Sequence, residues 1–161
     1  MIPSGISGVV PIAEMRGDDE QETALLHAAY REARAFLLSR KWCFGIREIY
    51  FGAGLGGVVS VFLAQLDPIP TDVDEWLWVI VGDVPPAYLV LDVCRTPIDA
   101  LKSYIDLLQE WVDLAREGTE SPDVIPVNRA PTRENAEELQ LRLDSLRTTI
   151  IPWLEQGPAV Q

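Results

Sequence analysis

The run Trp76-Leu-Trp-Val-Ile-Val81 contains only aromatic and branched aliphatic residues. Such residues favour β-strands, and six of them without polar alternation predict a strand that is covered on both faces. A turn over Gly82–Pro86 separates this run from a second apolar run, Tyr88-Leu-Val-Leu91. Because the connection is too short for a crossover helix, the two runs are predicted to form an antiparallel hairpin with both faces covered.

Further strand signals surround this hairpin, where aromatic and β-branched runs are cut by turn residues. Four strands are expected, at Trp42–Phe51, Val58–Leu66, Glu75–Gly82 and Ala87–Val93. All the connections between them are short, so neighbouring strands should be antiparallel and should follow one another in a meander.

A helix is predicted before the sheet. Several acids open it, with Asp18 or Asp19 as the N-cap residue, where the positive end of the helix dipole favours negative charge. Apolar residues then recur every three or four positions to about Arg40. This spacing is typical of a helix with one face turned toward a core.

Two helices are predicted after the sheet. Thr96 as N-cap and Pro97 at the first helical position begin one helix, which Gly118 ends. Thr132 caps the last helix, and Pro152 should end or kink it. Matching apolar stripes favour an antiparallel pair packed on the sheet. The predicted fold class is α+β: an N-terminal helix, a four-stranded antiparallel β-meander and two C-terminal antiparallel helices packed on the sheet.

The length of 161 residues fits a single domain. We expect an N-terminal arm at residues 1–17, one α+β domain at 18–155 and a C-terminal tail at 156–161. The longest apolar run has six residues, whereas about 20 are needed to cross a bilayer, so no membrane span is expected. Only two cysteines are present, too few for a secreted disulfide framework, and a cytoplasmic location is predicted.

Few residues could carry catalysis. His27 is the only histidine, and a surface or boundary position is favoured over a catalytic base. Cys94 precedes the Thr96 cap, where a helix N-terminus could activate a thiol, although a buried and inert thiol is favoured. The run Gly52–Gly57 lacks the spacing of phosphate-binding glycines and is interpreted as a flexible hairpin loop. No catalytic residue, metal site or cofactor is predicted.

Charge is the most informative feature of the sequence. The net charge is -12, and residues 67–123 carry 13 acids against three bases. Five of these acids fall on the polar face of the helix that follows Thr96, and four more lie at or next to the two ends of the third predicted strand. The predicted partner-binding residues are Asp99, Asp106, Glu110, Asp113, Glu117, Asp72, Asp74, Glu75 and Asp83.

Such a surface attracts basic partners and repels nucleic acid and anionic membranes. The sequence is therefore interpreted as a small acidic cytoplasmic binding protein that engages a basic protein partner, for example a nuclease toxin, as immunity proteins do. This comparison depends on charge and size and not on a shared fold.

Two alternatives remain open. One is a small-molecule-binding module or enzyme with a pocket between the sheet and the C-terminal helices, lined by Trp76, Trp78, Tyr88 and Trp111. The other is a structural homodimer, which the hairpin with two apolar faces suggests.

Overall fold

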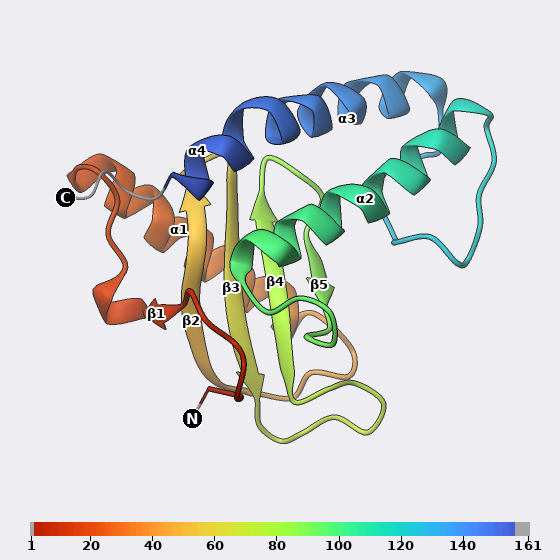
Figure 1. Cartoon of the computed structure of the whole chain (residues 1–161). Coiled ribbons are helices and arrows are strands. Elements are labelled where there is room, and N and C mark those ends of the chain that lie inside the picture. The colour runs from red at the N-terminus through yellow and green to blue at the C-terminus, as the bar shows by residue number, and fades with distance from the viewer. Residues whose placement is uncertain (1, 157–161) are drawn as a thin grey trace. The chain divides into compact units, whose positions relative to one another are not determined.

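The computed structural model describes residues 2–156 and confirms an α+β fold with an antiparallel sheet (Figure 1). The chain divides into two compact units, residues 1–101 and 102–161. The first unit holds the sheet and the N-terminal helix, and the second holds the C-terminal helices. A single domain at residues 18–155 stays a prediction, and the tail predicted at 156–161 lies, except for Gln156, outside the described residues.

The sheet of the first unit has five strands where four were expected. Each strand pairs antiparallel with the next in the order β1-β2-β3-β4-β5. The additional strand, β1, comes from the predicted arm, where Val10 pairs with Phe51. A strand of two residues, one of them a proline, has no alternating pattern by which a sequence could reveal it. The strands are β1 Val10–Pro11, β2 Ile46–Leu55, β3 Val59–Leu66, β4 Trp76–Gly82 and β5 Ala87–Leu89.

β2 begins and ends four residues later than predicted. Its predicted start is instead a turn after the preceding helix, in which the Cys43 N–H donates to the Arg40 carbonyl at 3.1 Å. Its end extends through Gly52, where a Cβ would lie 2.6 Å from Pro97 Cγ. The flexible loop expected at residues 52–57 is therefore wrong for Gly52–Leu55, which are strand, and the tight turn follows, with Gly57 at φ +79°.

The expectation of two covered faces is confirmed for β4 and wrong for β5. Residues 77–81 of β4 are all fully buried. β5 stops at Leu89 instead of reaching Val93, and Tyr88 keeps 36% of its surface exposed. As the edge strand, β5 is short, which limits the unpaired backbone that an edge exposes.

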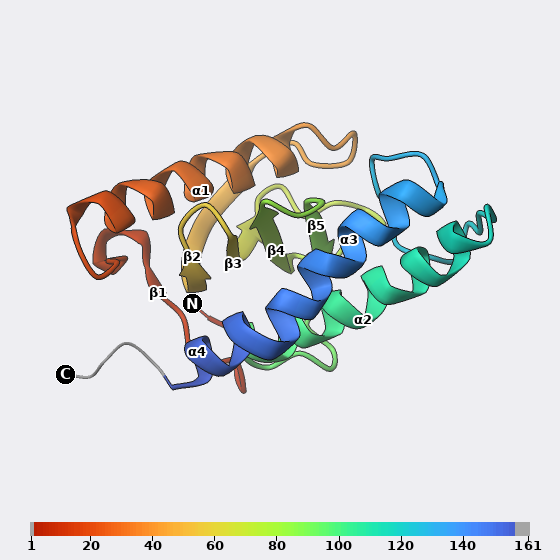
Figure 2. The same cartoon turned by 90° about the horizontal axis from the view of Figure 1, so that it is seen from above.

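Helix α1, Glu20–Leu38, covers one face of the sheet (Figure 2). Asp19 caps it, as expected, by accepting the Glu22 N–H at 2.7 Å. The Glu22 carboxylate in turn accepts the Gly56 N–H at 2.6 Å, which fixes the β2–β3 turn to the start of the helix. The buried core between helix and sheet includes Leu26, Ala29, Ala33, Leu37, Phe62, Ala64, Leu77, Val79 and Val81.

The opposite face of the sheet carries the segment that follows β5. Trp78 is fully buried, and its indole N–H donates to the Cys94 carbonyl at 2.9 Å. Because Trp78 alternates with Leu77 and Val79, which face α1, its ring lies on the other side of β4. The segment around Cys94 is thus held against this second face.

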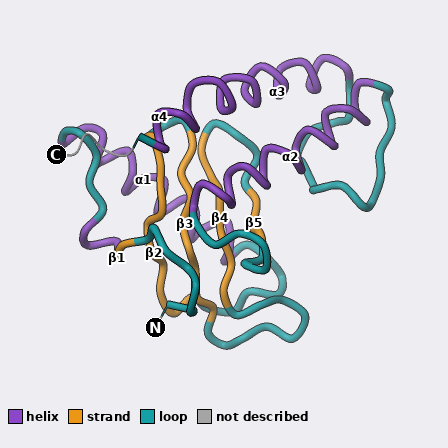
Figure 3. The backbone as a smooth tube through the Cα atoms, viewed as in Figure 1, coloured by secondary structure: helices purple, strands orange, loops and turns teal. Residues whose placement is uncertain are grey.

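The second unit consists of antiparallel helices, which confirms the predicted pair. Helix α2, Pro97–Arg116, begins in the first unit, where the Thr96 hydroxyl accepts the Asp99 N–H at 3.1 Å. In the second unit, Lys102 contacts Glu155 and Arg116 contacts Glu137, so the helices run in opposite directions. Figure 3 shows the long loop that joins them. The remaining elements are the short 3-10 helix η1 Ile12–Glu14 of the first unit and, in the second, α3 Arg133–Ser145, the π-helical turn η2 Leu146–Ile150 and α4 Ile151–Glu155.

The last helix continues past the predicted break at Pro152. Proline has no N–H and its ring crowds the carbonyl four residues earlier, so an unbroken α-helix would be strained there. The π-helical turn immediately precedes α4, and it widens the helix at this point. The proline therefore changes the helix type locally instead of ending the helix.

Candidate functional site

Five exposed acids lie along α2 and just beyond its end, and we call them the α2 acidic row: Asp99, Asp106, Glu110, Asp113 and Glu117. Steps of seven, four and three residues bring side chains back to the same side of a helix, so the row follows one face. Asp99 belongs to the first unit and the other four to the second. The buried residues of α2, such as Leu108 and Val112, fall outside this face.

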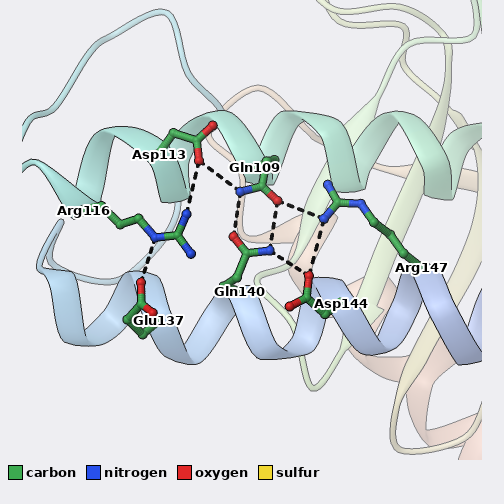
Figure 4. A network of polar contacts seen from close by, with 7 residues as sticks. All are labelled: Gln109, Asp113, Arg116, Glu137, Gln140, Asp144 and Arg147. Atoms are coloured by element: carbon green, nitrogen blue, oxygen red, sulfur yellow. Dashed lines mark hydrogen bonds and ion pairs between the residues drawn. The ribbon is translucent and has the colours of Figure 1, made fainter.

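A network of polar side chains joins α2 and α3 (Figure 4). At its centre, Gln109 Nε2 donates to Gln140 Oε1 at 2.7 Å, and Gln140 Nε2 donates back to Gln109 Oε1 at 3.2 Å. Such reciprocal bonds fix both side-chain amides and so fix the register of the two helices. The network consists of Gln109, Asp113, Arg116, Glu137, Gln140, Asp144 and Arg147.

The network also orients one member of the acidic row. Asp113 Oδ1 accepts Gln109 Nε2 at 3.0 Å and lies 3.6 Å from the Arg116 guanidinium. Arg116 in turn donates through Nε to Glu137 at 2.7 Å, and this hydrogen bond raises the pKa of the guanidinium. Asp113 is therefore held in place from two sides, although its side chain stays 60% exposed.

The network reveals an internal repeat that the sequence analysis missed. Gln109-x3-Asp113-x2-Arg116 and Gln140-x3-Asp144-x2-Arg147 have the same spacing and lie 31 residues apart. Both copies repeat the bond from glutamine to aspartate. Buried residues also recur at this offset, namely Leu108 with Leu139, Val112 with Leu143 and Ala115 with Leu146. Because the helices are antiparallel, the copies are related by an approximate two-fold axis.

The two copies of the repeat are not equivalent in their contacts. Arg116 forms an ion pair across to Glu137, and the residue that corresponds to Glu137 in the first copy is Asp106. Arg147 donates across to the neutral Gln109 Oε1 at 2.9 Å, and its charge pairs at 3.8 Å with Asp144, three residues before it. Asp106 is thus an exposed carboxylate at a position that forms an ion pair in the other copy.

The predicted loop acids do not form one cluster. Asp72, Asp74 and Glu75 precede β4, whereas Asp83 follows it. The seven residues of β4 separate the two groups by roughly 20 Å. Figure 3 shows the two loops at opposite ends of the strand. Glu75 is half-buried and accepts Gln65 Nε2 at 2.6 Å.

One of these loops borders an open pocket of about 330 Å³ in the first unit. Asp74, Glu75 and Trp76 contribute to it from the start of β4, and Asp92 and Arg95 from the segment after β5. Two of the nine predicted site residues, Asp74 and Glu75, are thus brought to a concave surface together with a guanidinium. Sequence analysis did not identify Asp92 and Arg95, because they become neighbours of Asp74 only when β4 and β5 pair.

The candidate catalytic residues take structural positions. His27 is half-buried on α1. Both cysteines are buried, and burial raises the pKa of the Cys43 thiol. Tyr88, an aromatic candidate for the alternative pocket, packs edge-on against Trp42 with ring centroids 4.9 Å apart. These surroundings are typical of ordinary packing.

Within residues 2–156, every helix falls short of the length and apolar character that a membrane span requires. Over the same residues, no group of three or more His, Cys, Asp or Glu side chains is arranged to hold a metal ion. No protein-family model, curated protein or solved structure matches the chain.

Proposed function

We propose that this chain is a small acidic cytoplasmic protein that binds a basic protein partner through the α2 acidic row. The observation that carries the proposal is the row itself, which presents exposed carboxylates along one face of a helix. The network on α2 and α3 supports it, because side chains that are already ordered lose less conformational entropy when a partner binds.

Three members of the row are central to the proposal: Asp106, Glu110 and Asp113. They lie within two turns of one helix, and the remaining charge of the protein, -12 in total, adds a long-range attraction for cations. A partner with lysines and arginines spaced along a matching surface would meet all three carboxylates at once. Proteins that bind nucleic acid carry such surfaces, so a nuclease toxin is the kind of partner that this row fits.

The loop acids Asp72, Asp74, Glu75 and Asp83 have a different role in this proposal. Since they lie at the two ends of β4, a small basic patch cannot contact all of them together. We assign them to the general attraction of basic molecules and not to the contact surface. Their individual substitution should change the association rate more than the dissociation rate.

Affinity capture from the native host at low and at high salt tests the proposal. A basic protein captured at low salt and released at high salt is expected, because exposed charge pairs are screened. The double variant Asp106→Lys/Glu110→Lys should then abolish capture. Glu120→Lys/Asp123→Lys is the matched control, since it changes the net charge equally at exposed positions of the following loop. Equal loss of capture in both variants would remove the row from the proposal.

A further inference from the structure

The open pocket of the first unit carries charges of both signs. Among residues 2–156, Asp74, Asp92 and Arg95 take part in no ion pair, although all three line the same pocket of about 330 Å³. Glu75, the third carboxylate, accepts a hydrogen bond from the neutral side chain of Gln65. The pocket therefore presents three carboxylates and one guanidinium that the described protein does not neutralise.

The rest of the pocket is apolar. Trp76, Leu91 and Pro3 contribute to its lining. The Trp76 ring is half-buried and stacks on Tyr50, with ring centroids 6.2 Å apart and an interplanar angle of 29°. This stacking fixes the indole, so that it forms a firm wall beside the charged groups. An indole next to carboxylates suits a cation on an aliphatic chain, which gains both ring contact and charge pairing.

We propose that this pocket binds a small ligand that carries one carboxylate and one cationic side chain, of the arginine or lysine class. Arg95 pairs with the carboxylate of the ligand, Asp74 and Asp92 pair with its cation, and Trp76 packs against its aliphatic chain. The volume lies at the lower end of the range for small-molecule sites, which suits a single amino acid. No pocket residue belongs to the α2 acidic row, so failure of the row as a contact surface would leave this inference standing.

L-Arginine is the probe for this site. The full-length ¹⁵N-labelled protein is titrated with it, and the amide signals of residues 74–76 and 91–95 are followed together with the Trp76 indole signal. Saturable shifts confined to these signals are expected, with a dissociation constant on the order of 1 mM. Agmatine, which lacks the carboxylate, and citrulline, which lacks the cation, should each bind about three- to tenfold more weakly. Absence of saturable shifts up to about 20 mM L-arginine would overturn the proposal.

Two variants test the assigned contacts. Arg95→Gln should weaken the binding of L-arginine about three- to tenfold. It should not weaken the binding of agmatine, because agmatine has no carboxylate for Arg95 to bind. Asp74→Asn should weaken both ligands. Asp72→Asn is the control, because Asp72 is an exposed acid of the same loop that does not line the pocket. It changes only the general attraction of basic molecules, and it should weaken L-arginine much less than Asp74→Asn does. An equal effect of Asp72→Asn and Asp74→Asn would show general charge attraction and would contradict the site. All three side chains are exposed at least in part, so the fold should survive each change.

Discussion

Different kinds of contact stabilise the sheet within the first unit and the helix pair within the second. In β3, seven of eight residues are buried, and Ser60 is its one buried polar side chain. In α3, three of thirteen residues are buried, and the helix contacts α2 through a chain of glutamine, carboxylate and guanidinium groups. Burial of apolar surface dominates the sheet of the first unit, whereas directional polar contacts supplement the narrow apolar stripe of α3 in the second.

This difference has a consequence for specificity. Apolar contacts are non-directional, so the register of β3 against β4 depends on the geometry of the connecting turn and on which side chains face each buried side. A narrow stripe of leucines would tolerate sliding of one helix along the other, and the reciprocal Gln109–Gln140 bonds oppose it. Substitutions should therefore affect stability most in the first unit and affect helix register most in the second.

The largest effect is expected from Phe62→Ala in β3. Phe62 is fully buried and lies between Tyr30 of α1 and Phe51 of β2, with ring centroids 6.4 and 5.8 Å away. Its truncation should lower the free energy of unfolding by about 3–5 kcal/mol, measured by urea denaturation. Phe44→Ala is the matched control, because Phe44 is 76% exposed and its loss should cost less than about 0.5 kcal/mol. Similar losses in both variants would contradict the apolar account of the first unit.

Tyr104→Phe should reduce the sensitivity of the protein to alkali. Tyr104 is fully buried in the second unit, and burial raises its pKa well above the ordinary value. The buried Tyr104 contributes its full stabilisation below about pH 10, where the tyrosine of the unfolded chain is protonated as well. This stabilisation is lost as the pH rises further, because only the unfolded state then ionises. Above that pH, the free energy of unfolding of the wild type should fall by up to about 1.4 kcal/mol per pH unit more than that of the variant. Urea midpoints between pH 8 and pH 11 measure both slopes, and parallel slopes would show that Tyr104 is not the cause.

Local signals correctly predicted the helices α1, α2 and α3, the strands β2 to β5 and the helix N-caps. Asp19, Thr96 and Thr132 each accept the N–H three residues ahead, as the helix-start patterns indicated. Errors occurred where tertiary contact overrides local preference. The glycines of β2 are an example: they indicated a loop, yet Gly52 lies within the strand, and a glycine stands there because Pro97, 45 positions later, packs where a side chain would be.

The candidate site was predictable to a lesser degree. Helical spacing alone placed Asp106, Glu110 and Asp113 on one exposed face. The pocket was not predictable, because Asp74 and Arg95 approach each other only through strand pairing. The repeat of glutamine, aspartate and arginine at an offset of 31 residues is present in the sequence. It was missed because the periodic pattern that predicts helices is made of apolar residues only.

The Gln109–Gln140 pair allows a direct test of register control. Gln140→Ala removes the acceptor of Gln109 Nε2 and should lower the stability by about 1 kcal/mol. The double variant with Gln109→Ala should cost less than the sum of the single variants, because the two side chains interact directly. Urea denaturation of the four proteins gives this coupling. Glu110→Gln, next to Gln109 but outside the network, is the control and should leave stability nearly unchanged. If the stability losses of the two single variants simply add up in the double variant, the Gln109–Gln140 pair does not control the helix register.

The smallest expected effect is a difference in stability between variants of the two copies of the repeat. Arg116→Gln removes charge pairs with Glu137 at 2.7 Å and Asp113 at 3.6 Å. Arg147→Gln removes a hydrogen bond to the neutral Gln109 at 2.9 Å and a longer charge pair with Asp144 at 3.8 Å. Both side chains are about one-third exposed, so each loss should be smaller than that of Gln140→Ala. Both losses should shrink in high salt, because salt screens charge pairs, and the loss for Arg116→Gln should shrink more, since Arg116 has two carboxylate partners and one of them is at 2.7 Å. Arg133→Gln, an exposed cation at the start of α3, controls for net charge. The same salt dependence for both variants would mean that the repeat is symmetric in its energetics as well as its spacing, and would contradict the asymmetry of its contacts.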